Sequence, residues 1–535
     1  MSTQQFKRKT LALAVGVALS SMAYANPTGM NVVAGQATSQ ALGDLLKVTN
    51  SPGAVIQWQQ FNIDANQTTQ FIQQNAASQV FNKVVGGDVS QILGSLKSNG
   101  QVFLINPAGV IFGQGAVIDT AGFVASALAA STADLVNGHL KFEGDPASNA
   151  SIQNLGTLTT HSGGSIVLIA PNIQNSGIIR ADGEVLLAAG HKVTIVDLNH
   201  PTVGLSVEAQ VGGQAVNLGD IVGKNASVFA SLIKNSGVVE ATGVQQGAGG
   251  VIRFVAQDNT VLANTSNLNA SGVSGGQIDV QSVSGDTLVD GQVRANGQTG
   301  VGGQVNLTGH RIAVLSGATV QADGATGGGT VHIGGGWQGK DPSLQNSTQT
   351  VVQAGANVSA NATDNGQGGE LVAWSDGRTQ VDASLQARGG ANGGNGGRVE
   401  TSGKELLQVS QAADTRAPKG HGGQWLLDPA NLNVVDTLPT SSPPPQTVPP
   451  PDPSFQPPGG YFSTGNQTGD SYILASTIKQ GLEFGNGSVT LSTRGSAAGN
   501  GDINVLAPIL VDQPTLYPQP ELTLDAAGTI NINAA

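Results

Sequence analysis

Short runs in which apolar and polar residues alternate are the dominant pattern along this chain. Two examples are QIDVQS, which begins at Gln277, and QVNLTG, which begins at Gln304. Alternation with a period of two predicts a β-strand that buries one face. Glycine, asparagine and aspartate separate the runs, and these residues favour tight turns. The pattern therefore predicts an all-β protein made of many short strands.

The strands recur at nearly regular intervals. A Gly-Gly pair precedes many of them, and the first glycines of these pairs are Gly249, Gly275, Gly302, Gly328, Gly368, Gly396 and Gly422. Successive pairs are 26, 27, 26, 40, 28 and 26 residues apart. A second element, in which an apolar residue, Ala and Gly occupy alternate positions, occurs at 179–183, 239–243, 268–272, 293–297, 320–324 and 385–389. Such a period indicates a repeat architecture.

A unit of about 27 residues cannot bury its own apolar face, but stacked units bury a shared interior. Each strand then pairs with its copy in the next coil. We therefore predict a right-handed parallel β-helix, a solenoid, with an N-terminal capping and secretion region. A chain of β-sandwiches and a β-propeller are the alternatives, although propeller blades need about 40–50 residues each. The 40-residue step predicts a loop that bulges from one coil.

The region before the Gly-Gly repeat differs in composition. Residues 26–135 have more varied side chains, and the passages VSQILGSL (89–96) and FVASALAAS (123–131) predict short helical turns. A solenoid needs a cap over its first open coil, because an exposed sheet edge invites aggregation. We expect residues 26–135 to supply that cap.

The N-terminus predicts export. Lys7-Arg8-Lys9 precede the apolar run Leu11–Leu19, and Ala23-Tyr24-Ala25 follow it. This is the pattern of a secretory signal, with cleavage expected between Ala25 and Asn26. The run is shorter than the ~20 apolar residues that a membrane-spanning helix needs. The chain contains no Cys, so it forms no disulfides despite its export.

Charge and side-chain chemistry narrow the function classes. A net charge of −12 argues against a nucleic-acid partner, because phosphate contacts need clustered Lys and Arg. We expect no catalytic residues, no cofactor and no metal, since the chain lacks a nucleophile motif, a phosphate-binding loop and the His spacing of a zinc site. The seven histidines are scattered at positions 139, 161, 191, 200, 310, 332 and 421. Asp182, Asp286, Asp290 and Asp323 lie at differing offsets and predict no acidic catalytic cluster.

Four passages resemble a known family. They are NPTGMNVVAGQA (26–37), IQWQQFNIDANQTTQF (56–71), NKVVGGDVSQILGSLKSNGQVFLINPAGVIFG (82–113) and GFVASAL (122–128). In this order they resemble the secretion domain of two-partner-secretion exoproteins, the filamentous-haemagglutinin type. Residues 396–410 and 422–435 resemble passages in the high-molecular-weight adhesin branch of that family.

The resemblance assigns a secretion motif. The family turn Asn-Pro-Asn-Gly corresponds to Asn106, Pro107, Ala108 and Gly109, so Ala108 departs from the pattern. A second family turn, Asn-Pro-Asn-Leu, has no clear counterpart. Pro107 fixes its own φ and restricts Asn106 to extended conformations, while Gly109 can adopt a positive φ. The resemblance implies that Asn106, Pro107 and Gly109 help a partner transporter to recognise the unfolded chain and then nucleate the β-helix.

These observations predict five regions and a function. The regions are a signal peptide (1–25), a two-partner-secretion domain (26–250), β-helix repeats (251–435), a Pro-rich linker (436–460) and further β-rich repeats, expected to be truncated (461–535). The resemblance implies export by the general secretion translocon and then by an outer-membrane β-barrel transporter. It implies a secreted or surface-bound adhesin that binds a glycan or protein receptor on host cells. The alternatives are a haem-scavenging exoprotein and the secretion end of a contact-dependent toxin.

Overall fold

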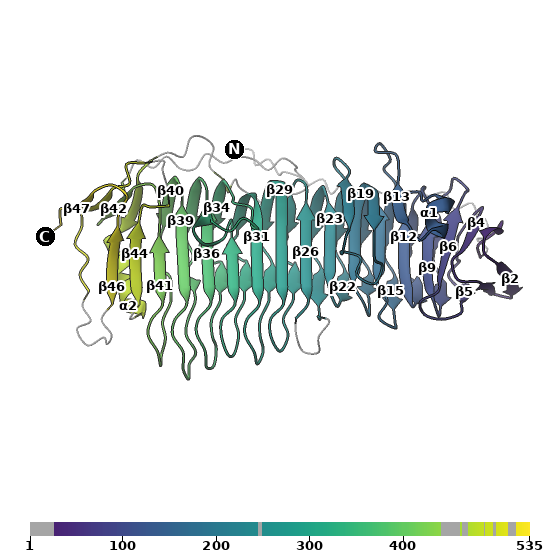
Figure 1. Ribbon diagram of the computed structural model, residues 1–535, viewed down its shortest axis with the longest axis horizontal. Coiled ribbons are helices and arrows are strands. Elements are labelled where there is room, and N and C mark those ends of the chain that lie inside the picture. Colours follow the sequence, from purple (N-terminus) through teal and green to yellow (C-terminus); the bar gives the residue numbers. More distant parts are fainter. Residues whose placement is uncertain are drawn as a thin grey trace, which may run out of the picture.

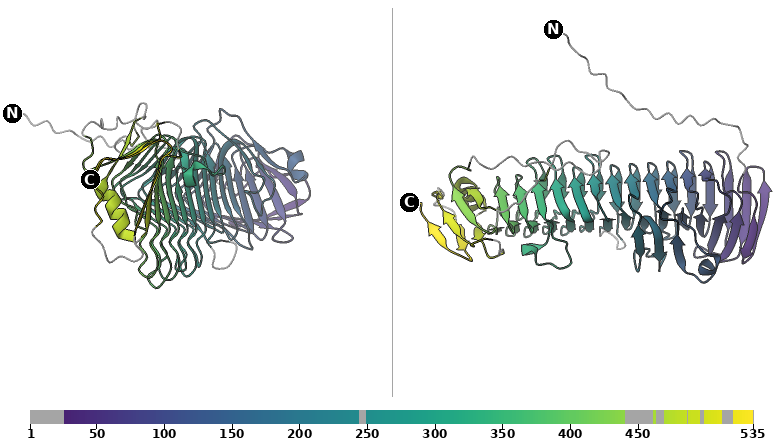
Figure 2. Two further views of the ribbon diagram at one scale, coloured as in Figure 1. Left: turned by 60° about the vertical axis from the view of Figure 1, so that its left-hand side comes forward. Right: turned by 90° about the horizontal axis from the view of Figure 1, so that it is seen from above.

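A computed structural model describes residues 26–243, 249–439, 461–462, 469–485, 487–495, 499–511 and 520–534. The predicted signal peptide and most of the predicted Pro-rich linker lie outside the described residues. The described chain forms one long rod of stacked β-strands (Figure 1). The predicted parallel β-helix is therefore confirmed, and its coils follow the chain from one end of the rod to the other (Figure 2).

Three parallel ladders run along the rod. The first ladder contains, in order, β4 (Ala54–Trp58), β6 (Gln79–Val84), β9 (Gln101–Ile105), β12 (Gly122–Ser126), β16 (Ile166–Ala170), β19 (Val185–Ile195), β23 (Ala226–Ala230), β26 (Val251–Ala256), β29 (Gln277–Val289), β31 (Gln304–Val314), β33 (Thr330–Ile333), β36 (Glu370–Ser375), β39 (Arg398–Gly403), β41 (Gln424–Leu427), β44 (Ser488–Ser492) and β46 (Glu521–Asp525).

The second ladder lies around the corner from the first. It contains β7 (Ser90–Ile92), β10 (Val110–Phe112), β14 (Ser151–Asn154), β17 (Asn172–Asn175), β21 (Gln214–Asn217), β24 (Leu232–Asn235), β27 (Thr260–Leu262), the C-terminal halves of β29 and β31, β34 (Gln349–Val352), β37 (Arg378–Val381) and β40 (Leu406–Val409). After β40 it continues with β43 (Ser471–Leu474), β42 (Leu432–Val435), β45 (Ile503–Val505) and β47 (Ile530–Ile532). Strand β43 thus lies between β40 and β42, although it follows both in the sequence.

The third ladder closes each coil. It contains β3 (Leu45–Asn50), β5 (Thr68–Ile72), β8 (Ser95–Ser98), β11 (Val117–Thr120), β15 (Thr157–Thr160), β18 (Ile178–Arg180), β22 (Asp220–Gly223), β25 (Val238–Ala241), β28 (Asn267–Asn269), β30 (Gln292–Arg294), β32 (Thr319–Gln321), β35 (Asn357–Ser359) and β38 (Leu385–Gln386). Inward-facing Val, Ile and Leu of the three ladders form one continuous hydrophobic core. Helix α2 (Ala475–Gly485) also contributes Ile478 and Leu482 to that core.

The N-terminal cap is shorter than predicted. Strands β1 (Asn31–Ala34) and β2 (Ala37–Leu42) pair antiparallel with β4 and β3. Parallel stacking already begins at β3 and β4, so the expectation of a cap over residues 26–135 is wrong in its extent. The predicted helical turns at 89–96 and 123–131 are also wrong, because these residues form β7, the start of β8, and β12.

The Gly-Gly pairs and the Ala elements meet at one corner of each coil. The Ala295 carbonyl accepts a hydrogen bond from Gly303 N (2.7 Å), and the Ala270 carbonyl accepts one from Gly276 N (2.8 Å). A Cβ on Gly303 would lie 2.0 Å from the Gly276 carbonyl oxygen in the neighbouring coil. The corner requires glycine because backbone contacts backbone there. Both repeat elements therefore mark the position where one coil closes against the next.

Each coil between residues 268 and 397 extends a loop between its Ala-containing turn and its glycine pair. These loops lie side by side and form a continuous row, drawn teal to green along the lower edge of the rod in Figure 1. We call them the loop row; its residues are 271–274, 296–301, 323–327, 361–367 and 388–395. Parallel bridges such as Gly272 to Gly297 and Gly297 to Gly324 keep successive loops in register.

Buried asparagines form a second line of polar contacts, inside the N-terminal half of the rod. Asn154 Nδ2 donates to Asn175 Oδ1 (2.7 Å), Asn175 Nδ2 to Asn217 Oδ1 (2.8 Å), and Asn217 Nδ2 to Asn235 Oδ1 (2.7 Å). Each of these side chains is almost completely buried. A buried amide is stable only when it is hydrogen-bonded, so the ladder fixes the register of successive coils.

Candidate functional site

The residues of the predicted secretion motif form a corner between two ladders. Asn106 to Gly109 connect β9 of the first ladder to β10 of the second. Gly109 N donates to the Asn106 carbonyl (2.9 Å), which closes the turn. The sequence predicted a rigid turn between two strands here, and the hydrogen bond and the two flanking strands match that expectation.

Asn106 is completely buried, and its side chain makes three hydrogen bonds. Its Nδ2 donates to the Asp88 carbonyl (2.9 Å) and to Ser90 Oγ (2.9 Å), both in the preceding coil. Its Oδ1 accepts from Ala108 N (3.0 Å), while its backbone N donates to Ser126 O (2.8 Å) in the next coil. The Asn106 side chain and backbone therefore connect three successive coils.

The other motif residues differ in exposure. Pro107 is exposed and Ala108 is half-buried, whereas Gly109 is buried. Gly109 has a φ of +114°, and a Cβ there would lie 2.8 Å from the Ser151 carbonyl oxygen. The folded surface thus presents only Pro107 and part of Ala108. Asn106, the residue with the most polar side chain in the motif, is inaccessible once these coils have formed.

A second hydrophobic cluster covers the outside of the first ladder near this motif. It contains Phe81 and Phe103, whose ring centroids are 4.5 Å apart. Helix α1 (Thr132–Val136), capped by Ser131 Oγ, covers it together with β13 (Leu140–Glu143), the far end of β19, and β20 (Ser206–Ala209). The strands here are therefore buried on both faces.

A polar chain crosses the outer face of the first ladder in the middle of the rod. Asn306 donates from Nδ2 to Asp279 (2.8 Å) and faces His332 Nδ1 through Oδ1 (3.1 Å). His332 Nε2 lies 2.8 Å from Glu370, which also pairs with Arg398. Burial raises the pKa of Glu370, but its hydrogen bond to His332 and the charge of Arg398 outweigh this and lower it overall. Arg253 lies 3.7 Å from Asp279, so each of the two acids in this row of polar side chains has an arginine partner.

Glu400 lies next to this chain and is fully buried. The loop after β33 covers it, and this loop includes the 3-10 turn η1 (Trp337–Gly339). Gln338 N donates to Glu400 Oε2 (2.7 Å), whereas Oε1 has no hydrogen-bond partner in the described chain. Burial, followed by the charges of Asp428 and Glu370, raises the pKa of Glu400 to about 7. This is the bulging loop that the 40-residue step predicted, but no sequence pattern indicated the buried acid beneath it.

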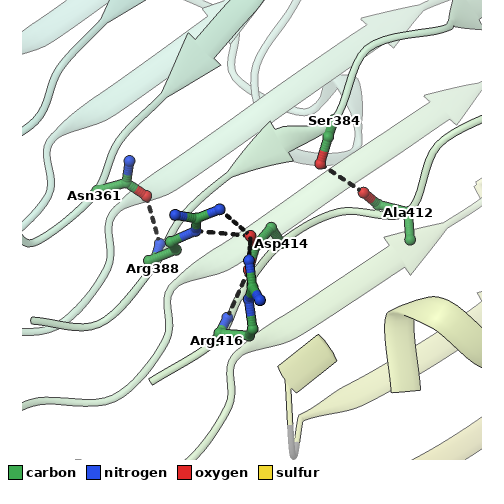
Figure 3. Close-up of polar contacts among 6 residues, drawn as sticks. All are labelled: Asn361, Ser384, Arg388, Ala412, Asp414 and Arg416. Atoms are coloured by element: carbon green, nitrogen blue, oxygen red, sulfur yellow. Dashed lines mark hydrogen bonds and ion pairs between the residues drawn. The ribbon is translucent and has the colours of Figure 1, made fainter. Parts of the chain in front are cut away.

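Polar side chains join the coils along the loop row. Asn361 Oδ1 accepts from Arg388 N (2.8 Å), and Arg388 Nε donates to Asp414 (2.7 Å), as Figure 3 shows. Arg416 donates to the same carboxylate from Nε (2.9 Å) and Nη2 (2.6 Å). Burial raises the pKa of Asp414, but the hydrogen bonds from Arg416 and Arg388 outweigh it and lower the pKa overall. This cluster holds neighbouring coils together and leaves both guanidinium groups partly exposed.

The histidines and acids considered for chemistry lie apart from one another. His139, His161, His200, His310 and His421 are exposed, His191 is half-buried, and His332 belongs to the polar chain above. Asp286 pairs with Arg311, and Asp182 accepts from Gly163 N (2.6 Å). Within the described residues no group of three or more His, Asp or Glu side chains is arranged to hold a metal ion. The described helices include none with the length and apolar character of a membrane span.

Comparisons with known proteins agree with this geometry. A family model described as the TPS secretion domain matches residues 27–261. The crystal structure of the HMW1 secretion domain from Haemophilus influenzae superposes with a TM-score of 0.59 and 33% identity, covering 75% of this chain and 100% of that one.

Two curated relatives are heme/hemopexin-binding proteins of Haemophilus influenzae. One, from strain Rd, is 29% identical over 265 residues, which is 46% of this chain and 26% of the relative. The other is 35% identical over 127 residues, which is 23% of this chain and 14% of the relative. The matched region thus spans about a quarter or less of the length of these relatives.

Proposed function

The chain belongs to the two-partner-secretion exoproteins, and from this we propose that an outer-membrane β-barrel transporter exports it by binding the Asn106 turn before that turn folds. As a member of this family it is secreted through the periplasm to the cell surface or the extracellular space. Its N-terminal region is the part that carries the secretion-domain match.

The observation that supports this proposal is the burial of Asn106. A side chain with 0% exposure and three internal hydrogen bonds has no polar atom left for a partner. In an unfolded segment the same amide offers two donors and one acceptor oxygen. Recognition of Asn106 is therefore possible only ahead of folding. Burial of apolar side chains in successive coils outside the cell then favours outward movement, without a nucleotide as energy source.

A peptide experiment separates recognition from folding. Residues 99–113 would be synthesised and titrated against the purified periplasmic domains of the transporter. We expect replacement of Asn106 by Ala to weaken binding about tenfold or more, because hydrogen bonds to a buried polar group are worth about 1–3 kcal/mol. A matched peptide carrying Ala108→Asn restores the family sequence and should bind at least as well as the natural one. Equal binding of the natural and the Asn106→Ala peptides would refute the role of Asn106.

Secretion by cells provides the second test. Source cells with and without the transporter gene would be fractionated, and the exoprotein followed in periplasm and medium. We expect external protein only in cells with the transporter, and periplasmic retention of the Asn106→Ala variant. Asn137→Ala is the control, because Asn137 is an exposed residue at the end of α1.

For the exported rod we propose adhesion to a glycan or protein on host cells. The support is the loop row, which repeats similar polar loops at the spacing of the coils and so allows many weak contacts at once. Cells that carry the exoprotein should bind host cells more strongly than cells lacking it. Purified rod should compete for this binding.

The second candidate is binding of haem or of a haem-carrying host protein. The names of the two curated relatives favour it, although the matched regions are a small part of each. Calorimetry of the purified chain with haemin, with haem-loaded haemopexin and with apo-haemopexin distinguishes the candidates. Saturable binding of any of the three supports this second function, and its absence leaves adhesion as the proposal.

A further inference from the structure

The outer face of the second ladder carries an apolar stripe in the middle of the rod. We call it the outer stripe; its residues are Val261, Leu288, Ala313, Leu315 and Val351. Val261, Leu288, Ala313 and Val351 are aligned in register on successive strands. The same row continues as Lys234 on one side and as Gln380 on the other. Outward positions of this ladder are thus polar at both limits of the stripe and apolar between them.

Two aromatic residues from much later in the chain lie on this stripe. Phe462 packs into the apolar cluster and is only 3% exposed, and Tyr461 contacts the same cluster. The guanidinium carbon of Arg311 lies 4.5 Å from the centre of the Phe462 ring. Asp286 holds Arg311 in place through two hydrogen bonds of 2.8 and 2.6 Å. A fixed cation above an aromatic ring and apolar walls around it make a site of defined shape.

The strand that follows this aromatic pair has an unusual position. Strand β43 lies between β40 and β42, and it pairs with β40 only through Gln408 and Tyr472. Leu407 N donates to Ser471 Oγ (2.9 Å). Every earlier strand of this ladder follows its neighbour in sequence order. When the rod grows from its N-terminus, β42 is therefore available before β43. The edge of β40 must remain unpaired until β43 has been added.

Docking of the aromatic pair explains how β43 reaches that edge. Ser471 follows Phe462 by nine residues, which span at most about 30 Å. The row from Val351 through Gln380 and Gln408 to Tyr472 covers three strand spacings, or about 14 Å. A docked Phe462 thus keeps β43 within reach of its site and raises its effective concentration there.

We propose that the outer stripe is a docking groove for the chain's own Tyr461–Phe462 pair, and that this docking directs β43 into its place between β40 and β42. The groove recognises an extended peptide that carries an aromatic anchor. The aromatic pair that binds here comes from the same chain. It docks before the coils that contain β43 and the strands after it are complete. This proposal concerns the assembly of the rod and is independent of the function proposed above.

Hydrogen exchange of the full mature chain tests the guiding role. Truncation of a buried Phe removes a large packing contribution, so in Phe462→Ala we expect exchange in β43 to accelerate on the order of 100-fold. Exchange in β16 should not change. Leu438→Ala is the matched control, since Leu438 is 52% exposed in the same part of the sequence. Exchange in β43 that stays within about threefold of this control would overturn the proposal.

A peptide added in trans tests the groove even where the variant assembles poorly. A labelled peptide of residues 457–466 should bind the Phe462→Ala chain with saturable anisotropy, but it should leave β43 as unprotected as before, because the peptide is not linked to that strand. The same peptide with Phe462 replaced by Ala should not bind. Failure of the natural peptide to bind would overturn the groove. A wild-type dimer that Phe462→Ala converts to monomer would show that the pair comes from a second copy, which would overturn the intramolecular assignment.

Discussion

Replacement of Glu400 by Gln should remove a pH dependence of stability that the buried acid imposes. Burial raises the pKa of Glu400 from the ordinary 4.5 to about 7 in the folded chain. Each unit of pKa corresponds to about 1.4 kcal/mol, so ionisation of Glu400 in the fold costs about 3 kcal/mol. Below pH 4.5 Glu400 is protonated in both the folded and the unfolded chain, and its burial carries no ionisation cost. As the pH rises from 4.5 to about 7, the unfolded chain ionises first, so the folded chain loses stability relative to it. Between these values the natural chain should therefore lose up to about 3 kcal/mol.

Gln is the informative substitution at this position. Its amide oxygen can still accept the hydrogen bond from Gln338 N, and its NH2 group can donate toward the acidic side of the site, where Asp428 lies. It cannot ionise. We therefore expect Glu400→Gln to be as stable as the natural chain at pH 4.5 and more stable by up to about 3 kcal/mol at pH 8.

Guanidinium unfolding at pH values from 4.5 to 8 provides the assay, followed by tryptophan fluorescence. Trp337 lies in the covering loop and Trp374 is buried beside it, so the signal reports on this part of the rod. Glu405→Gln is the control, because Glu405 is a half-buried acid just beyond β39. Parallel pH curves for the natural chain and Glu400→Gln would refute the reasoning, because they would show that Glu400 does not titrate in this range.

Three further substitutions test other parts of the structure. Asn106→Ala should destabilise the coils around it by about 3 kcal/mol, measured by hydrogen exchange of residues 86–92, because it leaves the donors and acceptors of three hydrogen bonds unpaired. Gly303→Ala should prevent close stacking of two coils and expose the corner to proteolysis, because the new Cβ would lie 2.0 Å from a backbone oxygen. Gly87→Ala is the control, since a Cβ there meets open space and should leave the rate of proteolysis unchanged. Asn217→Ala should lower the melting temperature by breaking the buried ladder at two hydrogen bonds. Asn504→Ala also breaks two asparagine hydrogen bonds, to Asn433 and Asn531, but Asn504 is half-buried and its replacement should have a smaller effect.

The repeating part of the fold could be predicted from the sequence because its cause is local. The glycine pairs mark corners where backbone meets backbone, and alternation marks the face that each strand buries. Strand β12 was instead expected to be helical, because a strand buried on both faces has a continuous apolar sequence. Its second burying surface comes from α1 and β13, which no local pattern connects to it.

The polar sites were harder to predict for the same reason. The Asn106 turn follows from its own residues and from the family resemblance. Glu400 is an ordinary outward-facing polar residue of β39, and only the loop after β33 buries it. The position of β43 depends on contacts across more than a hundred residues of sequence, such as that between Phe462 and Arg311. Such contacts leave no periodic signal.

The burial of Asn106 bears on whether the folded product can inhibit its own export. A transporter that binds this side chain has affinity for the chain only while the corner between β9 and β10 is open. Under the recognition proposed above, completed rods at the cell surface would not compete with unfolded chains in the periplasm, however high their concentration becomes. Export would then be free of inhibition by its own product, and its rate would follow the supply of unfolded chain.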